Sequence, residues 1–142
     1  MVGRFPIWIH HREQVVYGFP IVDAPGIKVA FHGSGLYVNV EEYTQTPRQE
    51  VTDRLQAYLE RYLPEAAGDA FDPTTCLYTN TPDEDFIVDT APNLPQVTIA
   101  AGFSGHGFKF AIAIGRAVAD LIEQGGTELE IGHFGLDRFR GA

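Results

Sequence analysis

Apolar residues recur along this chain with two different periods, which predicts strands in some segments and helices in others. Residues 8–9 and 15–22 are rich in strand-forming side chains, so we expect them to pair as a hairpin. Over residues 27–32 larger apolar side chains alternate with the rest. Because successive side chains of a strand point to opposite faces, Lys28 and His32 are expected on one face and the larger apolar side chains on the other.

Two longer segments carry apolar residues at helical spacing. The first is expected to be capped by Thr46, to take Pro47 as its first residue and to end before Pro64. The second runs from Phe108 to Glu123 and is apolar over most of its circumference, which predicts a helix buried on more than one side. Gly125 follows it and is expected to end it.

The remaining apolar runs predict further antiparallel pairing. Residues 74–79 and 86–88 flank a tight turn at 81–84, which predicts a second hairpin. Another turn at 91–95 leads to a short buried strand at 97–100, and the last residues are interpreted as a short closing strand or loop. These elements predict an α+β fold, mostly antiparallel sheet with two principal helices.

Composition narrows the possible partners. The 142 residues suffice for one domain or a piece of a larger protein, and a net charge of −9 argues against nucleic acid or an anionic membrane as partner. No apolar run reaches the roughly 18 residues that a membrane span needs. A single cysteine, Cys76, cannot form an internal disulfide and favours a reducing cytoplasm. No metal-binding spacing occurs, since His10 and His11 are adjacent and lack a surrounding ligand pattern.

The turn between the strand at 97–100 and the final helix concentrates the candidate chemistry. It contains Gly102, Gly105 and Gly107, with His106 and Lys109 beside them. The first N–H groups of a helix attract anions, and a buried lysine there would need an anionic partner. The pattern favours an anion or cofactor site over the alternative, a strand–helix connection that needs glycine only for its tight geometry. The glycine spacing is not Gly-x-Gly-x-x-Gly, so no dinucleotide fingerprint lies here.

Other candidates have ordinary explanations beside the functional ones. Lys28 could be a solvent-facing strand lysine or an ammonium that stabilises a developing negative charge. Cys76 could be a small buried apolar residue, because no neighbouring cation in the sequence favours a thiolate. The acidic run at 83–85 is more typical of a solvated loop, and Ser104 lacks the Gly-x-Ser-x-Gly context of a nucleophile.

Four stretches, taken together, are similar to a known family. Residues 17–20, 26–32, 76–89 and 100–110 resemble, in order and spacing, the carboxy-terminal part of the monomeric sarcosine oxidase and N-methyltryptophan oxidase family of flavoenzymes. The resemblance implies oxidation of the C–N bond of a secondary amino acid such as sarcosine, with FAD as cofactor and O₂ reduced to hydrogen peroxide. It also implies a substrate-domain portion over residues 1–95 and, over 96–142, a strand–helix segment that completes the FAD domain.

The same resemblance assigns roles to individual residues. Lys28 matches the lysine that activates O₂, and His32 matches a histidine near the flavin. Cys76 matches the cysteine that forms a thioether to the flavin ring. Lys109 matches the lysine that binds the substrate carboxylate, while His106 and Tyr78 match residues of the substrate pocket. The residues of the turn expected to contact the flavin are Gly102, Phe103, Gly105, Gly107 and Phe108.

The chain departs from the family in extent. Family members are far longer and begin with a Gly-x-Gly-x-x-Gly unit that binds the ADP part of FAD, and they carry an arginine that pairs with the substrate carboxylate. Neither is matched here, which implies a truncated product, an excised domain or a partner polypeptide. The isolated chain is then expected to bind FAD weakly or not at all and to be inactive. Two alternatives stay open: a related amino-acid dehydrogenase or glycine-oxidase-like enzyme that does not use O₂, and a non-catalytic binding or assembly module that dimerises through its uncovered flavin-side surface.

Overall fold

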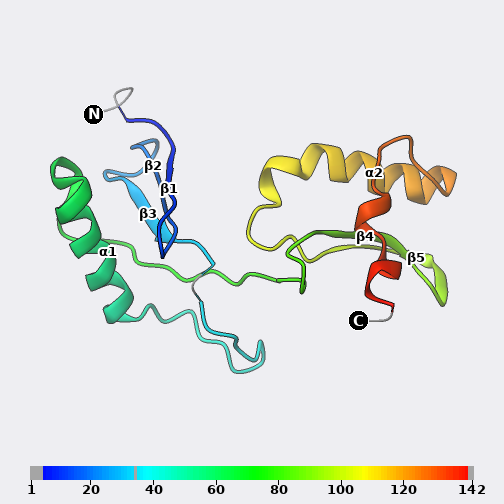
Figure 1. The fold of residues 1–142 in the computed structure, drawn as a ribbon, viewed down its shortest axis with the longest axis horizontal. Helices are drawn as coiled ribbons and strands as arrows, with labels where there is room; N and C mark the ends of the chain where they lie inside the picture. The colour runs from blue at the N-terminus through cyan, green and yellow to red at the C-terminus, as the bar shows by residue number, and fades with distance from the viewer. Residues whose placement is uncertain (1–4, 34, 141–142) are drawn as a thin grey trace. The chain divides into compact units, whose positions relative to one another are not determined.

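The computed structural model describes residues 5–33 and 35–140, and the chain divides into two compact units, Met1–Cys76 and Leu77–Ala142. Each unit combines antiparallel strands with one long helix, which confirms the predicted α+β fold (Figure 1). The expected functional division at residue 95 is a different boundary from that of the compact units, and it stays a prediction. Across the described ranges, no helix has the length and apolar character needed to cross a membrane.

The N-terminal unit contains a three-stranded antiparallel sheet and a helix. Its strands are β1 (Trp8–His10), β2 (Val16–Phe19) and β3 (Lys28–Phe31), in the order β1-β2-β3. The predicted hairpin and the predicted strand at 27–32 are therefore confirmed. Helix α1 (Gln49–Tyr62) packs against β3 and, through Trp8, contacts β1.

The strand register gives this sheet two different faces. Trp8 pairs with Gly18, so the indole lies over a residue without a side chain, and a Cβ at Gly18 would come within 2.5 Å of the Trp8 ring. The same ring stacks on Tyr58 of α1 at 6.1 Å between centroids. Val16, which shares this face, is only 1% exposed. The face turned toward α1 is thus the covered one, and the opposite face is not covered by α1.

The predicted start of α1 is wrong. The helix begins at Gln49, two residues later than expected, and neither Thr46 nor Pro47 belongs to its cap. Arg48 occupies the N-cap position with an extended backbone and makes no side-chain capping bond. The amide of Gln49 donates to Asp53 at 2.8 Å, so it is engaged along the helix instead of completing a capping box. The predicted end is confirmed, since α1 stops before Pro64.

The C-terminal unit contains a two-stranded hairpin and a helix. Strands β4 (Ile87–Ala91) and β5 (Leu94–Ala101) pair antiparallel, and helix α2 (Ala111–Gln124) packs against both. A short 3-10 turn, η2 (Phe108–Phe110), precedes α2. Two further 3-10 turns, η3 (Gly132–Phe134) and η4 (Leu136–Phe139), form the closing segment.

The predicted hairpin between residues 74–79 and 86–88 is wrong. Residues 74–79 form no strand, and β4 pairs along its whole length with β5 instead. The carbonyl of Thr79 accepts a hydrogen bond from the backbone N–H of Ser104 at 3.1 Å. The turn expected at 81–84 does form, and the N–H of Glu84 donates to the carbonyl of Thr81 at 3.2 Å.

Helix α2 buries one side, which corrects the prediction that it is buried on several. Ile114 and Ala117 join Phe86 and Val88 in the core of this unit. Ile112, by contrast, is 92% exposed, because it lies on the face of α2 turned away from the hairpin. The end of α2 is as predicted: Gly125 adopts a left-handed backbone with φ of 72°, and its N–H donates to Leu121.

A buried carboxylate fixes the C-terminal end of α2. Asp120 accepts hydrogen bonds from the hydroxyl of Thr127 at 2.8 Å and from Nε of Arg116 at 2.7 Å. These bonds, led by that of Thr127, lower the pKa of Asp120 despite its burial. The ionised Asp120 therefore ties the chain that follows α2 back to the helix.

Candidate functional site

The turn between β5 and α2 has an unusual backbone. Gly102, Ser104 and Gly105 all adopt positive φ values, of 64°, 47° and 77°. Glycine takes this conformation freely, but for serine it is strained. The Ser104 hydroxyl donates to the carbonyl of Gly102 at 3.1 Å and accepts a longer bond from the N–H of Thr81 at 3.4 Å. Ser104 is only 7% exposed, so buried hydrogen bonds hold the strained turn in place.

Close packing explains why two of the turn's positions are glycine. A Cβ at Gly105 would lie 2.2 Å from the ring of Tyr78, and one at Gly102 would lie 2.5 Å from the methyl group of Thr81. Such distances are far shorter than van der Waals contact, so no side chain fits without movement of the neighbours. The structure therefore brings Tyr78, one of the predicted site residues, directly against the turn.

The side chain of His106 is held by its surroundings. Its Nδ1 lies 3.1 Å from the carbonyl of Ser104, and its ring lies 5.0 Å from that of Phe86. Phe86 also contacts the ring of Phe103 at 5.1 Å. Two predicted site residues, Phe103 and His106, thus pack on one buried aromatic ring, which fixes where the imidazole lies.

Lys109 is exposed, which corrects the expectation of a buried lysine at the helix start. Its ammonium group lies 5.4 Å from the centroid of the neighbouring Phe110 ring. Lys109 and His106 both line a cavity of about 360 Å³, together with the acidic side chains of Asp85 and Glu130. This cavity offers cationic and anionic groups at once.

The start of the helical segment presents apolar surface. Phe108 is 97% exposed, although it directly follows the tightly packed Gly107, where a Cβ would lie 2.6 Å from Cβ of Phe103. Ile112 and Ile122 continue the exposed apolar stripe along α2. A ring this exposed gains nothing from burial within its own unit, and such surfaces commonly contact a ligand or another protein segment.

The N-terminal unit carries Lys28 on the sheet face that α1 does not cover. Its ammonium group lies 5.5 Å from the ring centroid of Tyr17 and 5.3 Å from that of Phe19. The ring of Tyr17 also lies 6.3 Å from that of His32, edge to face. The structure thus brings Lys28 and His32 to one shared ring, that of Tyr17, and Lys28 itself is exposed.

Sequence reasoning did not assign Tyr17 and Phe19 to the site. The signal was available, because residues two apart on β2 share a face, and β3 is its neighbour. The register pairs Phe19 with Lys28 directly and Tyr17 with Ala30, two residues from Lys28. Pairing the two predicted strands would have placed both rings beside the lysine.

Cys76 is an exposed free cysteine at the end of the N-terminal unit. The hairpin expected around Cys76 does not form, so this residue does not lie in a strand. Lys28, His32 and Cys76 belong to one unit, and the turn from Gly102 to Lys109 belongs to the other. The predicted site residues are therefore divided between the two compact units.

The acidic run at 83–85 forms an exposed turn, as expected of a solvated loop, and two of its carboxylates make ion pairs. Nε of Arg138 lies 2.7 Å from the carboxylate of Asp83, and Nε2 of His133 lies 2.6 Å from that of Asp85. The guanidinium hydrogen bonds from Arg138 hold the pKa of Asp83 well below its usual range. In the part of the chain that the structure describes, no three His, Cys, Asp or Glu side chains gather into a group able to hold a metal ion.

The residues of the turn suit the ring end of a flavin but not its nucleotide end. A flat ring system can lie against exposed Phe108, and the start of η2 favours the negative charge that a reduced flavin ring carries. The exposed thiol of Cys76 is accessible to a covalent partner. The sequence contains no Gly-x-Gly-x-x-Gly unit for a pyrophosphate.

Comparisons with known proteins agree with these features. The chain is 40% identical to monomeric sarcosine oxidase of Bacillus sp. (strain NS-129), over 96% of this chain and 36% of that protein. It is 33% identical to N-methyl-L-tryptophan oxidase of Escherichia coli O157:H7, over 87% of this chain and 33% of that protein. Among solved structures, L-proline dehydrogenase from P. horikoshii matches with a TM-score of 0.68 and 29% identity, over 88% of this chain and 32% of that one.

The chain spans about a third of the length of these relatives. Residues 3–121, most of the chain, match the family model described as FAD dependent oxidoreductase. The similarity to the relatives extends over nearly the whole chain, so it covers both compact units. The chain belongs to the FAD dependent oxidoreductase family.

Proposed function

We propose that this chain is the substrate-binding and flavin-facing part of an FAD-dependent oxidase of N-methyl amino acids such as sarcosine. The observation that carries the proposal is the strained, hydrogen-bonded turn at 102–107, whose exposed apolar end and helix start suit a flavin ring. The relatives named sarcosine oxidase and N-methyl-L-tryptophan oxidase support the substrate class. A further polypeptide segment supplies the nucleotide-binding half, since this chain spans about a third of those relatives.

FAD, when bound, would supply the redox chemistry: it would take two electrons as the C–H bond beside the substrate nitrogen breaks and C–N becomes C=N, and O₂ would take these electrons with two protons to give hydrogen peroxide. In this proposal Lys28 presents its ammonium group where O₂ gains negative charge, and electrostatic attraction lowers the cost of that charge. The rings of Tyr17 and Phe19 hold the ammonium by cation–π contact without neutralising it, as a carboxylate would. His32 lies near the flavin on the same face.

Substrate recognition is assigned to the C-terminal unit. The exposed ammonium of Lys109, in the middle of η2, attracts the substrate carboxylate. His106, fixed against Phe86, and Tyr78, fixed against Gly105, line the pocket. Both side chains are positioned by contacts within their own unit, so substrate binding does not have to order them.

Cys76 is proposed as the point of covalent attachment, because its thiol is exposed and the chain contains no second cysteine. Gly102, Phe103, Gly105, Gly107 and Phe108 are proposed to contact the flavin. The absence of a possible internal disulfide also leads us to infer a reducing compartment, the cytoplasm.

The proposal is tested by supplying FAD and sarcosine to the purified chain, alone and with a co-expressed polypeptide that carries the nucleotide-binding half. Anaerobic bleaching of the flavin absorbance reports substrate oxidation, and peroxide formed on aeration reports reaction with O₂. We expect both signals from the pair and neither from the chain alone. No flavin reduction by the pair would refute the amine oxidase; robust peroxide from the chain alone would refute the need for a partner.

A related dehydrogenase that does not use O₂ is the first alternative, and the solved proline dehydrogenase favours it. Lys28→Met in the flavin-loaded pair separates the two. In an oxidase, flavin reduction by substrate survives and reoxidation by O₂ slows by about tenfold or more. Lys109→Met is the matched control, since it should weaken substrate binding and leave reoxidation unchanged. A dehydrogenase would show no oxygen-dependent step for Lys28→Met to slow.

The second alternative is a non-catalytic assembly module, favoured by the exposed apolar stripe of Phe108, Ile112 and Ile122. Such a module is expected to self-associate through this face. Sedimentation over a range of concentrations tests it, with Ile112→Lys as the variant that should restore a monomer. A monomer at every concentration contradicts the module.

A further inference from the structure

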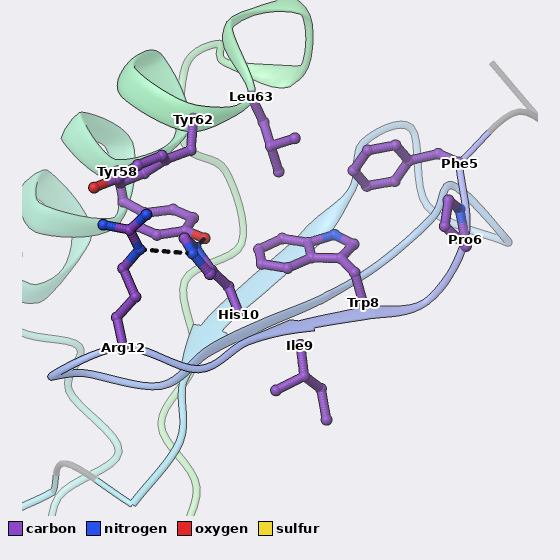
Figure 2. A pocket seen from close by; sticks show the side chains of 9 residues that line it. All are labelled: Phe5, Pro6, Trp8, Ile9, His10, Arg12, Tyr58, Tyr62 and Leu63. Carbon is purple, nitrogen blue, oxygen red and sulfur yellow. Dashed lines mark hydrogen bonds between the residues drawn. The ribbon is translucent and has the colours of Figure 1, made fainter.

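A second cavity lies in the N-terminal unit, away from the sheet face that bears Lys28. Figure 2 shows it between β1 and α1, where Trp8 and His10 of the strand point toward Tyr58 and Tyr62 of the helix. Ile9, between them in sequence, points to the other side, as strand alternation requires. The cavity has a volume of about 430 Å³, within the roughly 300–1,000 Å³ range of small-molecule sites.

Aromatic rings form most of its wall. The indole of Trp8 and the ring of Tyr58 are parallel within 6°, and the ring of Tyr62 lies 4.9 Å from that of Tyr58. Phe5 closes the far side, edge to face with Trp8 at 6.4 Å. This lining suits a ligand with a flat apolar body, which gains both apolar burial and ring contacts.

One end of the cavity carries positive charge. The guanidinium of Arg12 lies 5.3 Å from the centroid of the Tyr62 ring, and that of Arg61 lies over the same ring at 5.1 Å. Only Arg12 of these two lines the cavity. A cationic ligand would be repelled here and would compete with Arg12 for the face of the ring, whereas an anionic group gains a charge-assisted hydrogen bond.

The hydrogen bonds around His10 leave the Tyr58 hydroxyl as a neutral hydrogen-bond donor near the Arg12 guanidinium. Nε of Arg12 donates to Nε2 of His10 at 2.9 Å, and since a guanidinium can only donate, Nε2 must accept. The proton of the neutral imidazole therefore sits on Nδ1 and is donated to the hydroxyl oxygen of Tyr58 at 2.5 Å. This leaves the Tyr58 hydroxyl hydrogen to be donated elsewhere.

Burial, with the nearby Tyr62, raises the pKa of Tyr58, so its hydroxyl keeps that hydrogen at neutral pH. We propose that this cavity is a binding site for a small aromatic carboxylate, with the ring of the ligand among Phe5, Trp8 and Tyr58 and its carboxylate on Arg12 and the Tyr58 hydroxyl. The site is distinct from the proposed flavin and substrate residues and does not depend on them.

The chain's one tryptophan lines the cavity, so its fluorescence reports occupancy directly. Flavin-free protein is titrated with phenylacetate, with neutral phenylacetamide and with cationic phenethylamine. We expect saturable quenching by phenylacetate below about 10 mM, and binding of the two other compounds at least about tenfold weaker. Equal binding of phenylacetamide, or no saturation by phenylacetate, overturns the proposal without any variant.

Arg12→Gln is expected to weaken phenylacetate binding about tenfold, and Tyr58→Phe about three- to tenfold. Arg61→Gln is the matched control, because it removes a guanidinium from the same Tyr62 ring but outside the cavity, and it should change the affinity less than about twofold. Far-UV circular dichroism verifies the fold of each variant. An Arg12→Gln protein that folds and binds phenylacetate unchanged overturns the proposal.

Discussion

The two units hold their candidate functional groups in opposite ways. In the N-terminal unit, Lys28 projects from an uncovered sheet face and is held by two aromatic rings at its surface. In the C-terminal unit, the candidate turn is tied by the buried hydroxyl of Ser104, and His106 packs on the buried ring of Phe86. The arrangement in the N-terminal unit leaves the ammonium group of Lys28 accessible to a ligand. The arrangement in the C-terminal unit fixes the position of the turn and of the His106 ring.

The difference follows from where each unit keeps its core. The C-terminal core of Phe86, Val88, Ile114 and Ala117 lies directly beneath the turn, so packing and site share residues. In the N-terminal unit, Val16 and Leu59 are buried between the sheet and α1, on the side away from Lys28. We therefore expect core substitutions to disturb the site in one unit and to leave it largely intact in the other.

Gly105→Ala should produce the largest loss. A Cβ there would lie 2.2 Å from the Tyr78 ring on a backbone with φ of 77°, so strain and overlap add. We expect the free energy of unfolding of the C-terminal unit to fall by about 2–4 kcal/mol. Urea denaturation followed by circular dichroism measures it. Gly126→Ala, where a Cβ meets nothing within 4 Å, is the control and should change little.

A matched pair of core substitutions tests whether the units are independent. Val16→Ala and Val88→Ala each remove two methyl groups from a site less than 2% exposed, at an expected cost of about 1–3 kcal/mol to its own unit. Trp8, the only tryptophan, reports the N-terminal unit alone. Its fluorescence transition should shift in Val16→Ala and stay in place in Val88→Ala. A shift of equal size in both would show that the units unfold together.

Arg138→Gln should cost less, and its cost should depend on pH. Arg138 lowers the pKa of Asp83 below the ordinary 3.8, so the ion pair stabilises the folded C-terminal unit fully above that value. As the pH falls through the folded-state pKa, that stabilisation is lost. Thermal melts should therefore show a difference between wild type and variant that is constant from pH 7 to 5 and narrows at lower pH. If the difference in melting temperature stays constant down to pH 2, the stabilisation by Arg138 comes from its hydrogen bonds to the backbone carbonyls of Gly135 and Asp85 and not from the ion pair.

Gly115→Ala should give the smallest change and the only gain. Gly115 lies within α2, and a Cβ there meets nothing within 4 Å. Because alanine has the higher helix propensity, we expect the C-terminal unit to gain about 0.5–1 kcal/mol. Thermal melting measures the gain. A loss instead would indicate that this face of α2 is occupied in solution.

Local patterns predicted the elements whose partners are near in sequence. The hairpin of β1 and β2, the strand at 27–32 and the left-handed Gly125 all follow from alternation and turn chemistry. The residues at 74–79 favour an extended backbone, but they form no strand because β4, their expected partner, pairs with β5. Strand propensity cannot decide between two competing partners.

The sequence offered candidate residues for a site, whose roles stay predictions, but it did not predict the surroundings of those residues. The glycines of the turn marked its position, whereas the exposure of Lys109 depends on how η2 leads into α2. The apolar stripe of α2 predicted burial on several sides, yet the described chain covers one. The cavity around Trp8 could not be predicted from the sequence, because its walls come from β1 and from a helix some fifty residues later in the chain.

The left-handed backbone of Ser104 has a consequence for how this sequence can vary. Glycine at this position would relieve the strain but lose both hydroxyl hydrogen bonds, and alanine would keep the strain and lose the bonds as well. Only a short side chain that tolerates this conformation and can both donate and accept a hydrogen bond, such as that of asparagine, meets both demands. In a saturation library selected for folding, position 104 should therefore tolerate fewer residue types than most positions of the C-terminal unit. The residues that are tolerated should be those that adopt a positive φ readily, and among them those with a polar side chain should be more stable.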